Sequence, residues 1–194
     1  MWPAIGSAQP RTSSGAGCVG CVPFNIDSAL SSVLGRLRER NVRSLVQMGI
    51  RQMDLIDSGA LRAASGSCEE LVGLPRHVER LALDAISRAA YDIFRERYRT
   101  KADLPDAFIL TDDYLAHGAI TVLLAVGFRT GRDVLVITLA NKGNVPVHTD
   151  PIDLILYDPV READAIADAL LAYLDTGAAP GTITLESTFV AGSV

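Results

Sequence analysis

Short apolar segments alternate with longer segments of helical periodicity along most of this chain, with no internal repeat. The segments with strand character are residues 44–49, 70–74, 108–111, 134–139, 152–156 and 183–190. The segments whose apolar residues have helical spacing are 28–40, 53–64, 78–97, 114–126 and 162–174. Strands that are joined through helices pair in parallel, because the helix returns the chain across a face of the sheet. The order therefore predicts an α/β fold with a doubly wound, mainly parallel open sheet covered by helices on both faces.

The ends of the first predicted helix carry recognisable signals. Asp27 or Ser28 is well placed to cap its start, and Asn41 is suited to the left-handed conformation that stops a helix. Residues 1–23, which precede it, are rich in Gly, Ser, Pro and Ala without periodicity, so we expect them to form a flexible lead.

Net charge restricts the surfaces that this chain can bind. Its 194 residues carry a net charge of −5 with a pI of about 5.1. This is the wrong sign for a nucleic-acid surface. No apolar stretch approaches the roughly 20 residues needed to cross a bilayer, and the first residues lack the basic start and apolar run of a signal peptide. We therefore expect a cytoplasmic protein without membrane contact.

Three cysteines are too few for a disulfide framework. Cys18 and Cys21 have the spacing of a metal-binding pair, and Cys68 with His77 would complete a zinc site. A second closely spaced pair is missing, and the first lies in the Gly/Ser-rich lead. We therefore expect unpaired thiols, with no metal and no cofactor.

Polar residues follow three of the predicted strands. Asp112 and Asp113 come directly after residues 108–111, Asn141 follows the next strand, and Arg51 follows residues 44–49. Ligands of open parallel sheets bind beyond the carboxyl ends of the strands. The sequence thus predicts a crevice on which these side chains converge.

The two neighbouring carboxylates allow more than one role. Asp is among the best N-cap residues, so Asp112 is expected to cap the helix at Tyr114, while Asp113 points in a different direction. A pair of carboxylates could also hold Mg²⁺ for phosphoryl transfer, which leaves a magnesium-dependent enzyme using Asp112 and Asp113 as an alternative. Otherwise the sequence has no GxSxG elbow, P-loop or GxGxxG motif, and we do not expect an enzyme.

Several segments resemble the effector-binding core of LacI-type transcriptional regulators, the family of the lac and purine repressors. The segments are PDAFILTDDYLAHGAITVLLAVGF with DVLVITLAN, then PIDLILYDPVREADAIADALLAYLDTG, TITLESTFVAGSV and FNIDSALSSVLGRLRERNVRSLVQMG. Together they cover about residues 24–50 and 102–194.

The resemblance implies a type I periplasmic-binding-protein-like fold, in which two lobes hold a sugar or nucleobase between them. Asp113 falls on the family's ligand-binding Asp, whose two oxygens can accept hydrogen bonds from adjacent sugar hydroxyls. Arg51 corresponds to the family's effector-contacting Arg, and Asn141 replaces the last acid of the turn where the chain crosses between lobes. The ligand-binding residues implied are Asp113, Arg51 and Asn141.

By the same resemblance, residues 24–140 and 178–194 form the C-terminal lobe, and 141–177 supply a partial N-lobe strand and helix. The family's DNA-binding domain and most of the N-lobe have no counterpart in the sequence. We therefore expect the effector-sensing domain of a LacI-type regulator, in a homodimer, that reaches DNA only through a domain absent from this chain. A solute-binding protein of the same fold is the alternative.

The partial N-lobe has a further consequence. Strand 152–156 and helix 162–174 would be buried in relatives against N-lobe strands that this sequence lacks. We therefore expect this region to pack on another chain, to pack on residues 1–23, or to be mobile, and we expect effector affinity to be weak.

Overall fold

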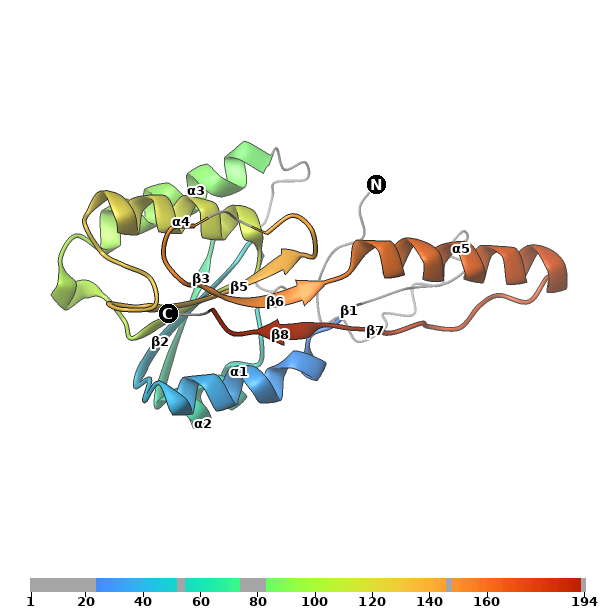
Figure 1. The fold of residues 1–194 in the computed structure, drawn as a ribbon, viewed down its shortest axis with the longest axis horizontal. Coiled ribbons are helices and arrows are strands. Elements are labelled where there is room, and N and C mark those ends of the chain that lie inside the picture. Colours follow the sequence, from blue (N-terminus) through green and yellow to red (C-terminus); the bar gives the residue numbers. More distant parts are fainter. Residues whose placement is uncertain (1–23, 52–54, 74–82, 146–147, 193–194) are drawn as a thin grey trace.

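The computed structural model describes residues 24–51, 55–73, 83–145 and 148–192 (Figure 1). Its α-helices are α1 Asp27–Glu39, α2 Ser58–Ser65, α3 Leu83–Arg97, α4 Asp113–Ala125 and α5 Pro159–Thr176. Its strands are β1 Phe24–Asn25, β2 Ser44–Gly49, β3 Ser67–Val72, β4 Ala107–Leu110, β5 Leu135–Asn141, β6 Asp153–Tyr157, β7 Leu185–Glu186 and β8 Thr188–Val190. A short 3-10 helix, Lys101–Asp103, lies between α3 and β4.

The main sheet has six strands in the order β3-β2-β4-β5-β6-β8. All neighbouring pairs are parallel except β6 and β8, which are antiparallel. Helices α3 and α4 cover one face, and α1 and α2 cover the other (Figure 1). The predicted mainly parallel α/β sheet with helices on both faces is confirmed.

Each face of the sheet has its own core. Strand side chains that alternate along β2 and β4 divide between them, as Val46 and Phe108 pack towards α3 and α4 while Leu45 and Ile109 pack towards α1 and α2. The two inner strands β4 and β5 are buried almost throughout, as expected for parallel strands covered on both sides.

The predicted end of the first helix agrees with the structure, but the predicted cap at Asp27 or Ser28 is wrong, because the helix begins at Asp27 after Ile26 and has no side-chain cap. Asn41 has a φ of 52°, and its N–H donates to the carbonyl of Arg38, so it ends the first helix as predicted. The predicted closing strand 183–190 is divided at Ser187. There the Ser187 N–H donates to Ser28 Oγ (2.9 Å), and β7 pairs with β1 rather than with the main sheet.

Strand β6 lies inside the main sheet, although the family resemblance placed residues 152–156 in a second lobe. It pairs with β5 in parallel and with β8 in antiparallel, and Ile155 is fully buried. Asp153 is also buried, and its carboxylate accepts hydrogen bonds from Arg36 Nε (2.8 Å) and the Gly192 N–H (2.7 Å). These partners offset the desolvation of the charge, so the strand can occupy an interior place.

Helix α5 extends away from the layered body (Figure 1). Its ends carry strong signals: Asp158 caps the first turn, Pro159 follows it, and Gly177 ends the helix in the left-handed conformation. None of its residues is buried. The helix is therefore defined by local sequence and not by packing against the sheet.

Candidate functional site

The carboxyl ends of β2, β4 and β5 lie side by side in the main sheet. Met48 pairs with Leu110, and Leu110 pairs with Thr138, so β2 and β4 end at nearly the same level, while β5 continues beyond Thr138 to Asn141. Arg51 follows β2, Asp113 follows β4, and Asn141 is the last residue of β5. The structure thus places the predicted residues beyond one edge of the sheet, with Asp113 at the start of the helix that follows β4.

Asp112 caps helix α4, as predicted. Its backbone is extended, and its Oδ1 accepts hydrogen bonds from the N–H groups of Tyr114 (2.9 Å) and Leu115 (3.2 Å). Its carbonyl oxygen lies 3.4 Å from Thr138 Oγ1, which links the turn to β5. The side chain therefore shapes the turn that presents the next residue.

Asp113 is the first residue of α4 and is half-buried. Burial raises the pKa of its carboxyl above the ordinary value, while hydrogen bonds from its own N–H and that of Tyr114 act in the opposite direction. Within the described residues its carboxylate forms no ion pair. It is a partly desolvated hydrogen-bond acceptor.

The carboxylate that follows β6, Asp158, has different surroundings from that of Asp113. Asp158, after β6, caps α5 through the N–H groups of Val160 and Arg161 and also pairs with Lys142 Nζ (3.0 Å). The Lys142 hydrogen bond lowers the pKa of this carboxyl. Asp112 and Asp158 thus serve the fold, whereas Asp113 forms no ion pair among the described residues.

The chain segment after β2 is held by Gln47, which was not among the residues predicted from the sequence. This side chain is fully buried; its amide donates to the Ile56 carbonyl (3.1 Å) and to Ser58 Oγ (2.7 Å), and its oxygen accepts from the Ile56 N–H (3.0 Å). Arg51 lies exposed within this connection. The available signal was a polar residue at the centre of the apolar segment SLVQMG, since a buried amide needs partners.

Metal chemistry finds little support among the described residues. No group of three or more His, Cys, Asp or Glu side chains there could hold an ion. Cys68 is buried, which raises the pKa of its thiol and disfavours the reactive thiolate. The other members of the zinc arrangement, Cys18, Cys21 and His77, lie outside the described residues. Among the described helices, none is both long and apolar enough to span a bilayer.

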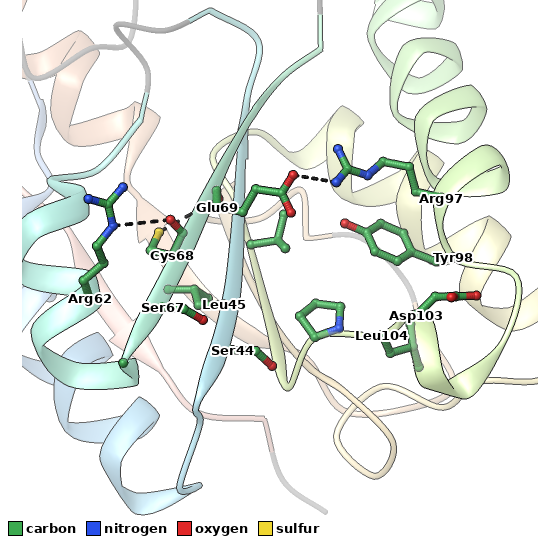
Figure 2. Close-up of a pocket in the computed structure, with 13 residues that line it drawn as sticks. Ser44, Leu45, Arg62, Ser67, Cys68, Glu69, Arg97, Tyr98, Asp103 and Leu104 are labelled. Carbon is green, nitrogen blue, oxygen red and sulfur yellow. Dashed lines mark hydrogen bonds and ion pairs between the residues drawn. The ribbon is translucent and has the colours of Figure 1, made fainter.

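A pocket of about 630 Å³ lies at the opposite, amino-terminal edge of the sheet (Figure 2). It surrounds the start of the edge strand β3 and is lined by residues that include Cys68, Glu69, Arg97 and Tyr98. No sequence motif predicted this pocket. It lies away from Asp113 and is therefore a separate feature from the carboxyl edge.

The chain matches the family model described as "Periplasmic binding protein-like domain" over residues 29–193. No curated protein sequence matches significantly.

Solved structures with this fold include LacI-family regulators. One from Arthrobacter sp. in complex with lactose has a TM-score of 0.64 and 17% identity, covering 91% of this chain and 66% of its own. One from Enterococcus faecalis with bound ribose has a TM-score of 0.64 and 13% identity, covering 88% and 61%. The Cra regulator from Pseudomonas putida with fructose 1-phosphate has a TM-score of 0.62 and 18% identity, covering 90% and 64%. The chain thus spans 61–66% of the length of these structures, and at such identities the likeness concerns the fold.

Proposed function

The chain belongs to the family of periplasmic binding protein-like domains, and from this premise we propose that it is the effector-sensing domain of a LacI-type transcriptional regulator. The effector is a small, sugar-like molecule that binds at the carboxyl edge of the sheet. The single observation that carries this assignment is Asp113, a half-buried carboxylate that follows strand β4 at that edge and forms no ion pair among the described residues.

Sugar recognition suits this carboxylate. An ionised carboxyl has two oxygens and can accept hydrogen bonds from two adjacent hydroxyls. Such bonds replace the hydration that burial has removed, so a polyol is a favourable partner for a desolvated acid. Arg51 and Asn141, from the neighbouring strand ends, would supply further donors to the same ligand. The regulators with bound lactose, ribose and fructose 1-phosphate support the sugar class.

We also propose how the lobes divide. The six-stranded sheet with α1 to α4 forms one lobe, and α5 with the segments around it belongs to a second lobe. One complete ligand-binding face gives weak binding, with dissociation constants of millimolar order. Contact with DNA is assigned to another domain, because the chain carries a net charge of −5, and assembly is expected as a homodimer.

A thermal-shift screen tests the assignment. Lactose, ribose, fructose 1-phosphate and free nucleobases would be added to the purified chain at up to tens of millimolar. A ligand at about ten times its Kd stabilises the folded state by about 1.4 kcal/mol, which raises the Tm of a chain of this size by about 3–6 °C. We expect at least one sugar to give such a shift.

Two variants make the screen specific. Asp113→Asn keeps the size of the side chain but removes the charge, and it should abolish the sugar-dependent shift. Asp92→Asn, on the exposed face of α3, is the matched control and should keep it. A shift of equal size in Asp113→Asn, or no shift with any sugar, would refute the proposed function.

A further inference from the structure

The acidic residues at the carboxyl edge of the sheet differ in what their charges do. Asp158 caps α5 and forms an ion pair with Lys142 (3.0 Å). Asp112 caps α4. Asp113 forms no ion pair among the described residues. Within the described part of the chain, the edge therefore holds a carboxylate whose charge is not balanced by an ion pair.

A ligand at this edge can reach the carboxylate of Asp113. The residue is half-buried at the first position of α4. Among the described residues, the side-chain atoms that are enclosed and also lack a hydrogen-bond partner belong to Tyr98, Thr130 and His148. The oxygens of Asp113 are not among these atoms. The carboxylate is thus partly desolvated without being sealed inside the fold.

Partial burial determines which ligand groups suit this carboxylate best. Burial raises the pKa of Asp113, so its negative charge is less favourable there than in water. Hydroxyl groups of a sugar can replace part of the lost hydration. An ammonium group replaces it as well and adds the opposite charge, and charge-assisted hydrogen bonds are roughly twice as strong as neutral ones. A ligand with a cationic group beside its hydroxyls therefore gains more than a neutral sugar does.

Anionic effectors are disfavoured at the same edge. The N-terminus of a helix can bind a phosphate, but the first N–H groups of α4 already donate to Asp112 Oδ1, at 2.9 and 3.2 Å. Lys142 is paired with Asp158. Arg51 is exposed, so water and salt screen its charge. A phosphate would stand near the charge of Asp113, and like charges repel.

We propose that the effector carries a positively charged amino group beside its hydroxyls, as an amino sugar does, and that Asp113 binds this ammonium group. Asn141, at the end of β5, can donate and accept hydrogen bonds and so suits the neighbouring hydroxyls. This inference rests on the proposed function, because it names the class of effector for the same site.

Matched pairs of sugars test the proposal. Glucosamine and glucose differ by an ammonium in place of a hydroxyl, as do galactosamine and galactose. Each would be titrated into the full chain at about pH 6.5 and followed by two-dimensional NMR. We expect at least one amino sugar to bind about tenfold more tightly than its parent sugar. Its N-acetyl derivative, which has no charge, should lose this advantage, and the 6-phosphate of the parent sugar should bind more weakly than the parent.

Two variants show whether the preference comes from Asp113 or from the overall negative charge of the chain. Asp113→Asn should bind neither sugar of the pair measurably. Asp92→Asn, on the exposed face of α3, loses the same charge elsewhere and should keep the tenfold preference. A tenfold preference that persists in Asp113→Asn would overturn the proposal.

The carboxyl ¹³C signal of Asp113, followed over pH, locates the ammonium group directly. A saturating amino sugar should lower the pKa of Asp113 more than its parent sugar does, because an adjacent cation favours the ionised carboxylate. Equal effects of the two sugars would contradict the proposal. If a neutral sugar binds at the edge and neither amino sugar binds more tightly than its parent, the amino-sugar inference is wrong while the proposed function stands. If no sugar binds, both are wrong.

Discussion

Asp112 and Asp113 are neighbours in the chain, yet their carboxylates have different surroundings. Asp112 receives two N–H hydrogen bonds at the start of α4, so its charge stabilises the fold. Asp113 is partly desolvated and forms no ion pair among the described residues, so its charge costs free energy in the folded domain. A residue that is unfavourable for folding and placed at a strand end is a candidate for binding.

Because the charge of Asp113 is unfavourable in the folded domain, Asp113→Asn should change how thermal stability depends on pH. Because burial raises the pKa of Asp113 above 3.8, the folded chain binds more protons than the unfolded chain just above that pH. The free energy of unfolding therefore falls as pH rises through this window. Asn cannot ionise, so the variant lacks this decrease in the free energy of unfolding. Its Tm should be higher than that of the wild type at pH 7, and the difference in Tm should become smaller towards pH 3.5. Thermal denaturation across this range checks it, and a lower Tm at pH 7 would be inconsistent with a desolvated carboxylate.

Asp153 illustrates a charge that serves the fold. Its side chain is 2% exposed and joins Arg36 of α1 and Gly192 to β6. Asp153→Ala would leave the largely buried Arg36 without this partner, and we expect a loss of about 3 kcal/mol in the free energy of unfolding. Glu39→Ala removes the exposed partner of the same Arg36 and should cost less than about 1 kcal/mol. Urea denaturation compares them, and equal losses would contradict the distinction.

At the scale of elements, local patterns predicted most helices, strands and caps. The arrangement of β2, β4 and β5 before Arg51, Asp113 and Asn141 was also predictable, because parallel topology by itself places the strand ends at one edge of the sheet. The features that local patterns did not predict depend on residues that are far apart in the sequence. The place of β6 within the main sheet is accompanied by the pairing of Asp153 with Arg36, which is 117 residues away. The pocket at the amino-terminal edge likewise depends on segments that meet only in the folded chain, which no local pattern encodes.

The contact between α3 and α4 depends on Gly118. A Cβ at this position would lie 2.0 Å from the Ser87 carbonyl oxygen, so Gly118→Ala must push the helices apart. We expect it to destabilise the domain by about 1–3 kcal/mol. Gly35→Ala, in α1 with nothing within 4 Å, is the matched control and should stabilise by about 0.5–1 kcal/mol. Chemical denaturation of the two variants measures both, and similar effects would show that the helices are not in close contact.

At the scale of the whole molecule, α5 is the feature without a packing partner among the described residues. Its exposed apolar residues include Leu170, Leu171 and Leu174, which are 54%, 60% and 68% exposed. Exposed apolar area is unfavourable by about 25 cal/mol per Å², and a contiguous apolar helix face is typical of an interaction surface. Among the described residues, the apolar face of α5 is therefore left uncovered.

We expect copies of the chain to associate through this helix. Sedimentation velocity should show a larger mean mass as protein concentration rises. The double variant Leu170→Asp with Leu174→Asp should remain monomeric with an unchanged Tm, because neither residue is buried in the single chain. If the wild type stays monomeric at high concentration, association through α5 is contradicted. The alternative is that residues 1–23 pack on α5, and the amide hydrogens of α5 would then exchange slowly.

The central claim is that an effector binds where β2, β4 and β5 end. The most direct measurement is two-dimensional NMR of the labelled chain during titration with the sugar that gives the largest thermal shift. The account predicts that the amide signals of Arg51, Asp113 and Asn141 move together with one dissociation constant, while those of Glu69 and Tyr98 stay in place. Signals that move only at the amino edge, or along α5, would contradict it.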